Sequence, residues 1–261
     1  MGLILCEDNR TVQPYYFRPL NLNVYSIEEL CYCIYENPYL VLDGFVDDRL
    51  KDFVQDVLRK KIYDNCSEEE LLIIILSGSD YYSAAEIDHY KTVISEILKL
   101  PRYEYLKRKA DYLFGLSQYE NAFVFYQQAL AAARNLRIKD IFYCDVNYNI
   151  GCCMANIFKY KEAFRYFETA YGYQNKESIL KSIYFLSKNA DILEDKLSFA
   201  AVLPREIPVE WDREYEDCNS KSAVCDEITM IESALEKDSI RRSAEFSRLL
   251  KKCKRDFRTN N

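Results

Sequence analysis

The residues Ala110–Ala129, with the sequence ADYLFGLSQYENAFVFYQQA, share a pattern with Gly151–Ala170, whose sequence is GCCMANIFKYKEAFRYFETA. Each copy begins with a small residue, which a Tyr follows nine positions later, an Ala twelve positions later and a large aromatic residue sixteen positions later. A further Ala ends each copy. Small residues let two helices approach closely, and the aromatic side chains fill the space between one hairpin and the next. The pattern therefore predicts two consecutive helical hairpins.

The two copies together resemble the tetratricopeptide repeat, a helical hairpin that stacks into arrays. The equivalent residues Ala122 and Ala163 lie 41 positions apart, whereas the standard repeat has about 34 residues. The hairpins are therefore expected to have longer helices or a longer connection at Arg134–Asp140. The resemblance implies an all-α fold built as a right-handed array of antiparallel helical hairpins, and proteins of this family generally hold other proteins.

Helix signals outside the repeats extend the predicted helical body from about Ser26 to Ala201. Ser26 and Ser67 are each followed three positions later by Glu, which is the sequence signature of a capping box. The acidic pair Asp47-Asp48 is expected to open a helix that runs to about Ile62. The apolar run 71–76 is expected to be a helix buried on most sides. Residues 1–25 are expected to be irregular, with one or two short extended segments.

The chain after Pro204 is predicted to leave the array. Residues 209–224 are polar and acidic and favour a linker or a frayed helix start, followed by helices at about 225–236 and 239–257. The last helix is strongly basic. It either caps the open end of the array with a charged outer face or docks an acidic partner or a membrane surface. The predicted divisions are 1–100, 101–201 and a C-terminal linker and helical hairpin at 202–261.

Composition narrows the function further. A formal net charge of −7 argues against nucleic acid as the main partner, because phosphate binding needs clustered Lys and Arg. The 10 cysteines include no CxxC pair, and the only His is His89, which is expected on a solvated helix face. We therefore expect reduced thiols, no metal and no cofactor. No apolar stretch approaches the roughly 20 residues that span a bilayer, so no membrane insertion is expected. A cytoplasmic location is expected, and the abundant Tyr, Ile, Asn and Lys suggest an AT-rich bacterial genome.

These observations predict a non-catalytic scaffold or adaptor that binds another protein or a peptide. The alternatives are a peptide-sensing regulatory protein and, third, an enzyme of a type without a recognisable motif. The binding surface is either the concave face of the repeats or the N-terminal helices. The resemblance places these residues on the concave face: Lys107, Asp111, Phe114, Asp145, Tyr148, Asn149 and Asn156.

One substitution distinguishes this face from that of the family's chaperone-tail-binding members. Those members clamp a terminal carboxylate with Lys and Asn. Lys107 and Asn149 match that pattern, but Asp111 stands where an Asn would be expected. Because an acid repels a carboxylate, the face is expected to favour partners that carry Lys or Arg.

Overall fold

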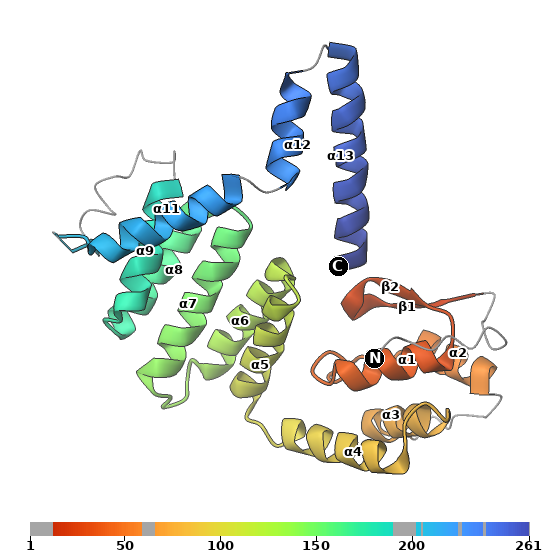
Figure 1. Ribbon diagram of the computed structural model, residues 1–261. Helices are drawn as coiled ribbons and strands as arrows, with labels where there is room; N and C mark the ends of the chain where they lie inside the picture. The colour runs from red at the N-terminus through yellow and green to blue at the C-terminus, as the bar shows by residue number, and fades with distance from the viewer. Residues whose placement is uncertain are drawn as a thin grey trace. The chain divides into compact units, whose positions relative to one another are not determined.

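The computed structural model describes residues 13–58, 66–189, 202–204, 206–223, 226–236 and 239–260. The chain forms two compact units, Met1–Tyr112 and Leu113–Asn260, and the division falls inside one helix, α5. The described residues are mostly α-helical with a single two-stranded sheet (Figure 1). The predicted all-α class is therefore confirmed, whereas the predicted three-part division stays a prediction.

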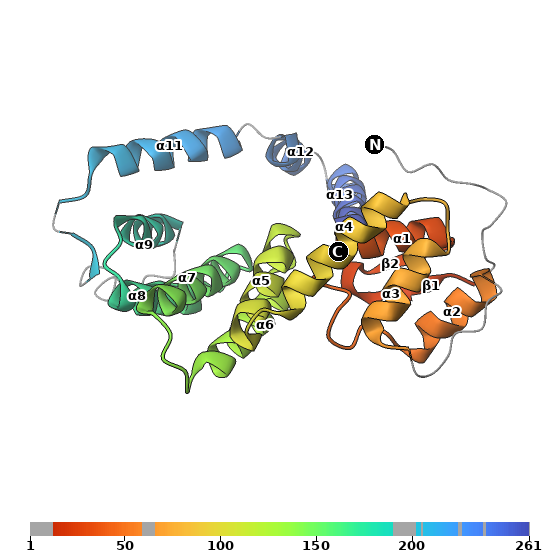
Figure 2. The same cartoon turned by 90° about the horizontal axis from the view of Figure 1, so that it is seen from below.

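The first unit begins with a β-hairpin and continues as helices. The strands β1 (Tyr15–Phe17) and β2 (Leu22–Val24) pair antiparallel, with Tyr15 opposite Val24. A 3-10 turn, η2 (Arg18–Leu20), connects them, and Asn21 takes a left-handed conformation with φ 52°. The strands lie beside α1 and α2 (Figure 2). The helices of this unit are α1 (Ile27–Glu36), α2 (Asp48–Leu58), α3 (Glu68–Ser77), α4 (Ala84–Leu98) and the first turns of α5 (Arg102–Gly115).

Serine caps start three of these helices. The Ser26, Ser67 and Ser83 hydroxyls each accept a hydrogen bond from the amide three residues on, which satisfies one of the unpaired donors at a helix start. Complete capping boxes form at Ser67 and Ser83. At Ser26 the predicted box is incomplete, because the Glu29 carboxylate accepts from the amide of Tyr25, at 2.7 Å, and not from Ser26.

The core of the first unit is aliphatic and aromatic. Leu30, Ile34, Leu72 and Ile75 are fully buried, and the Tyr35 ring stacks on Tyr82 with centroids 4.2 Å apart. The most unusual core residue is Lys109 of α5, which is 7 % exposed. Its ammonium donates to the Leu42 carbonyl, at 3.3 Å, and lies 3.4 Å from the Tyr105 hydroxyl. Lys109 thereby attaches α5 to the loop between α1 and α2.

The second unit contains the end of α5 and a series of helices that contact one another in chain order (Figure 1). These are α6 (Tyr119–Ala133), α7 (Asp140–Asn156), α8 (Tyr160–Tyr173) and α9 (Glu177–Asn189). After them come α11 (Val209–Ala223), α12 (Asp226–Leu235) and α13 (Ser239–Asn260).

The turns after α5 and α7 have the same hydrogen bonds, 41 residues apart. In the first turn Gln118 N donates to Leu113 O (3.0 Å) and Ser117 N to Phe114 O (2.9 Å). In the second, Lys159 N donates to Met154 O (2.8 Å) and Phe158 N to Ala155 O (3.1 Å). The pattern is a Schellman motif, which requires a left-handed residue. That residue is Ser117 in one turn, with φ 59°, and Phe158 in the other, with φ 62°.

The small residues of the sequence pattern are buried as predicted. Ala122, Ala129, Ala163 and Ala170 are each 0 % exposed, as expected where small side chains let two helices pack closely. In the contact between α7 and α8, Gly151 faces the buried ring of Phe167.

The C-terminal part corrects one prediction. Residues 209–223, predicted to be a linker or a frayed helix start, form the continuous helix α11. Side chains facing α9 explain the difference. The Trp211 ring lies 5.8 Å from that of Tyr184, and Asp212 accepts from Tyr184 and, at 3.0 Å, from Lys188. Tertiary contacts therefore stabilise a segment whose own sequence is too polar to predict a packed helix.

Candidate functional site

The residues predicted to form the concave face fall into both units. Lys107 and Asp111 belong to the first unit and form an i,i+4 ion pair on α5, with Nζ and Oδ2 2.8 Å apart. The other five belong to the second unit. Among them, Phe114 makes an edge-on contact with Tyr119, and Asn156 donates to the Cys152 carbonyl of its own helix at 2.9 Å.

Three of the predicted residues connect α7 to other segments of the second unit: α6, α9 and the α8–α9 connection. Asp145 pairs with Lys176, at 3.1 Å, and the Tyr148 hydroxyl lies 3.0 Å from that of Ser182 on α9. Asn149 donates to the Tyr126 hydroxyl of α6, at 3.1 Å. These polar groups are half-buried and already engaged within the chain. The sequence pattern did not predict that these three side chains have partners within the chain. The assignment of a partner to this face stays a prediction.

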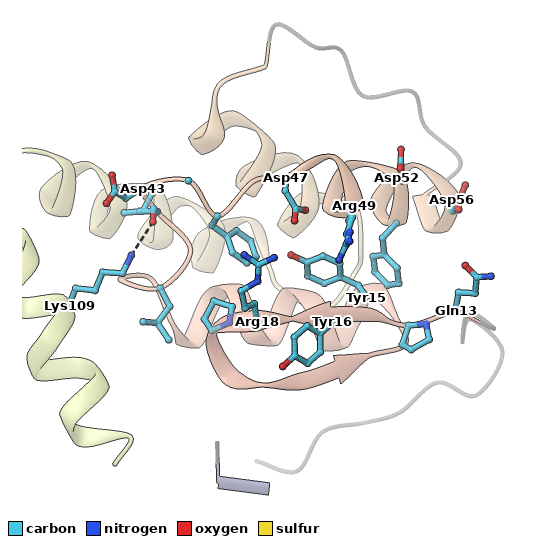
Figure 3. Close-up of a pocket in the computed structure, with 17 residues that line it drawn as sticks. Gln13, Tyr15, Tyr16, Arg18, Asp43, Asp47, Arg49, Asp52, Asp56 and Lys109 are labelled. Carbon is cyan, nitrogen blue, oxygen red and sulfur yellow. Dashed lines mark hydrogen bonds between the residues drawn. The ribbon is translucent and has the colours of Figure 1, made fainter. Parts of the chain in front are cut away.

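A pocket in the first unit lies between the β-hairpin, the α1–α2 loop and α2 (Figure 3). Its volume is about 520 Å³. The walls combine aromatic rings with charged groups of both signs, and Lys109 closes one end. The residues labelled there are Gln13, Tyr15, Tyr16, Arg18, Asp43, Asp47, Arg49, Asp52, Asp56 and Lys109. Sequence analysis singled out none of the arginines or tyrosines of this pocket, because they form no motif and come from separate elements.

Electrostatics differ between the two ends of this pocket. At one end Asp43 accepts from Arg102 at 2.8 Å, and this hydrogen bond lowers the pKa of the Asp43 carboxyl. Burial lowers the pKa of the neighbouring Lys109 ammonium, while the charge of Asp43 opposes that change. At the other end burial raises the pKa of the Tyr15 hydroxyl to about 12. Tyr15 therefore keeps its proton throughout the physiological pH range.

A second, apolar groove runs between α3 and α4 in the first unit, with a volume of about 820 Å³. Its floor is formed by isoleucine and leucine, and Ile74 and Leu98 remain 41 % and 48 % exposed. Carboxylates of α3 and ammonium groups of α4 border it. The lining residues are Cys66, Glu69, Glu70, Ile73, Ile74, Lys91, Ile94, Ser95, Leu98 and Lys99.

One feature of the sequence, the apolar run 71–76, indicates that α3 has more than one apolar face. The run 71–76 is apolar at every position, whereas a helix at a protein surface needs only one apolar stripe. Leu71, Leu72, Ile75 and Leu76 are buried. Ile73 and Ile74 face the other way and line the groove. The helix is therefore buried on most sides, as predicted, and the exposed Ile74 belongs to the face that lines the groove.

Cysteine and histidine residues contribute no catalytic geometry among the described residues. Cys31, Cys33, Cys144 and Cys153 are buried, and burial raises the pKa of Cys31 to about 11 and of Cys33 to about 12. Such thiols are protonated and unreactive at neutral pH. His89 is exposed on α4. The described part of the chain contains no group of three or more His, Cys, Asp or Glu side chains that could hold a metal ion, nor a helix that is both long and apolar enough to cross a bilayer.

Fold and site together define an all-α protein of two units, with a mixed-charge pocket and an apolar groove in the first. No protein-family model, curated protein or solved structure matches the chain.

Proposed function

We propose that this chain is a non-catalytic adaptor that binds an amphipathic helix of another protein in the α3–α4 groove. The observation that carries the proposal is the second apolar face of α3. Exposing Ile74 and Leu98 side by side costs free energy in water, and exposed apolar surface rimmed by polar residues is typical of interaction sites. Grooves between two helices commonly accept the apolar face of a third.

The charges that border the groove indicate what the partner helix carries. Glu69 is on α3 and Lys99 follows α4, and neither makes an ion pair with a described residue. By contrast Lys91 already pairs with Asp88, at 2.7 Å. A matching helix therefore has apolar residues at i, i+4 and i+7, a basic residue opposite Glu69 and an acidic residue opposite Lys99. Such complementary charges contribute to specificity more than to affinity.

The proposal includes an array of the tetratricopeptide type in residues 102–173. The two Schellman turns 41 residues apart and the buried alanines at equivalent positions support it. In this family the concave face of the repeats is the usual binding surface. Asp111 and Asp145 would attract a basic partner there, although each already has a Lys neighbour. The repeats therefore supply a second candidate surface for the same adaptor function. A cytoplasmic location, where thiols stay reduced, suits the buried cysteines.

The test compares purified full-length variants as baits in a lysate of the native host. The groove variant is Ile74→Asp/Leu98→Asp, and the concave-face variant is Asp111→Lys/Asp145→Lys. Val124→Asp is the control, because Val124 is an exposed apolar residue of α6 (47 %) outside the groove. Each protein that the wild type captures is then purified and titrated directly against all four baits.

The proposal predicts that a captured protein binds the wild type and Val124→Asp equally and the groove variant at least about tenfold more weakly, a change of about 1.4 kcal/mol. Loss of binding only in the concave-face variant would move the site to the repeats and keep the adaptor function. Equal binding to all four baits would refute both surfaces. Circular dichroism of each bait excludes unfolding as the cause.

A further inference from the structure

We propose that the pocket between the β-hairpin and α2 binds a small organic anion, whose phosphate or carboxylate group is held by Arg18, Arg49 and the hydroxyl of Tyr15. This inference is independent of the adaptor function, since it concerns a different surface of the first unit and a different class of ligand.

The two arginines supply the positive charge. Both are exposed, and neither side chain makes a hydrogen bond or an ion pair with a described residue. Arg18 follows β1 and Arg49 lies in the first turn of α2, so they approach the pocket from different elements. In Figure 3 the Arg18 guanidinium lies on the hydroxyl side of the Tyr15 ring, and the Arg49 side chain reaches from α2 towards the same ring. A guanidinium presents parallel N–H donors that match a carboxylate or a phosphate.

Tyr15 supplies the third donor. Its side chain is only 7 % exposed, and the ring packs against Phe53 with centroids 5.8 Å apart. The hydroxyl makes no hydrogen bond to a described residue, yet it is not fully enclosed and lines the pocket. Buried polar groups are normally hydrogen-bonded. A protonated hydroxyl that opens into a cavity beside two guanidinium groups is therefore suited to donate to an anion.

Two of the four carboxylates that line the pocket have partners within the chain. Asp43 is paired with Arg102. Asp47 accepts from the amide of Leu50, at 2.8 Å, and so caps the start of α2. It is the acid nearest to the proposed site, since its charge raises the pKa of Tyr15 while that of Arg18 lowers it. Asp52 and Asp56 also line the pocket, and in Figure 3 they lie further along α2 than Arg49.

The apolar walls define the rest of the ligand. Phe45 and Phe53 line the pocket, and each is held by a second aromatic ring, Phe17 in the first case and Tyr15 in the second. A cavity of about 520 Å³ falls within the usual range of small-molecule sites, about 300–1,000 Å³. The ligand class is accordingly a phosphate monoester or carboxylate that carries an aromatic or branched apolar group.

The experiment titrates the full-length protein with three probes of similar size by isothermal calorimetry. Phenyl phosphate and benzoate carry the two anionic groups, and benzyl alcohol carries the ring without charge. The variants are Arg18→Gln/Arg49→Gln and Tyr15→Phe. Arg165→Gln is the matched control, because Arg165 is an exposed arginine of α8 in the other unit. Circular dichroism establishes that each variant is folded.

The proposal predicts that at least one anion binds the wild type and Arg165→Gln equally, and about tenfold or more tightly than benzyl alcohol does. The double arginine variant should lose about tenfold or more in affinity, and Tyr15→Phe a smaller factor. If phenyl phosphate binds and benzoate does not, the ligand is assigned as a phosphate. If benzoate binds and phenyl phosphate does not, the ligand is assigned as a carboxylate. The proposal is overturned if neither anion binds, if benzyl alcohol binds as tightly as the anions, or if the double arginine variant and Arg165→Gln have the same affinity.

Discussion

Gly151 packs directly against the ring of Phe167: a Cβ atom at Gly151 would lie 2.5 Å from Cε1 of that ring. Phe167 is 3 % exposed, so the ring has little space into which to move. This contact is part of the packing between α7 and α8. It explains why a small residue is needed at position 151, since a side chain there would collide with the Phe167 ring.

Replacing Gly151 by Ala should therefore destabilise the second unit. The methyl group would displace Phe167, and overpacking costs about 1–3 kcal/mol. The better helix propensity of Ala returns up to about 1 kcal/mol of this. We expect a net loss of about 1–2 kcal/mol in the free energy of unfolding, measured by urea titration. The control is Gly172→Ala in α8, where no atom lies within 4 Å of the added methyl. Equal stability of the two variants would contradict the contact.

Phe158→Gly should stabilise the turn between α7 and α8. Phe158 has φ 62° and is 76 % exposed, so it has an unfavourable backbone conformation and little burial to compensate. Left-handed backbone costs an L-residue roughly 1–2 kcal/mol. We expect Phe158→Gly to be more stable than Phe158→Ala, which keeps that cost, by about 1 kcal/mol in thermal or urea unfolding. The equivalent pair, Ser117→Gly and Ser117→Ala, should differ in the same direction.

The first unit should lose stability at alkaline pH. Burial raises the pKa of Cys31 to about 11 and those of Cys33 and Tyr15 to about 12. An unfolded thiol has a pKa of about 8.5. Since the folded state holds these protons more tightly, the thiols' contribution is complete below about pH 8.5 and falls as pH rises towards the folded values. Tyr15 adds to the loss above about pH 10.

Urea midpoints at about pH 8 and about pH 10.5 test this expectation. The wild type should be less stable at the higher pH, and Cys33→Ala should lose less than the wild type does. Cys218→Ala, at an exposed position, should retain the full loss. If Cys33→Ala and Cys218→Ala show the same dependence on pH, deprotonation of Cys33 is not part of the mechanism.

Reversing Asp111 and Asp145 to Lys should leave the helices intact. Each substitution removes a partly exposed ion pair, with Lys107 and Lys176 respectively, and such pairs contribute about 0–1 kcal/mol. We expect an unchanged far-ultraviolet circular dichroism spectrum and a loss of at most about 2 kcal/mol from the two sites together. A larger loss would mean that these carboxylates hold the fold, and would remove this variant as a test of partner binding.

Several local features could be predicted from the sequence because they depend on neighbours along the chain. The serine caps at Ser26 and Ser67 agree with the structure. The small residues of the repeated pattern, among them Ala122 and Ala163, are buried as the pattern predicts. The assignment of the concave-face residues stays a prediction. Their bonds to Tyr126, Lys176 and Ser182 could not be predicted, since these depend on how α7 meets α6 and α9.

The sequence by itself therefore determined the helical class and the serine caps, since hydrogen bonds and the spacing of residues close in the chain decide these. Only the tertiary structure decided that α11 is a full helix, that Lys109 is buried against Leu42, and that Ile74 and Leu98 remain exposed together. It also brought Tyr15, Arg18 and Arg49 into one pocket. The physical reason is that burial and charge pairing depend on which surfaces meet in space, and sequence spacing does not specify contacts between distant segments.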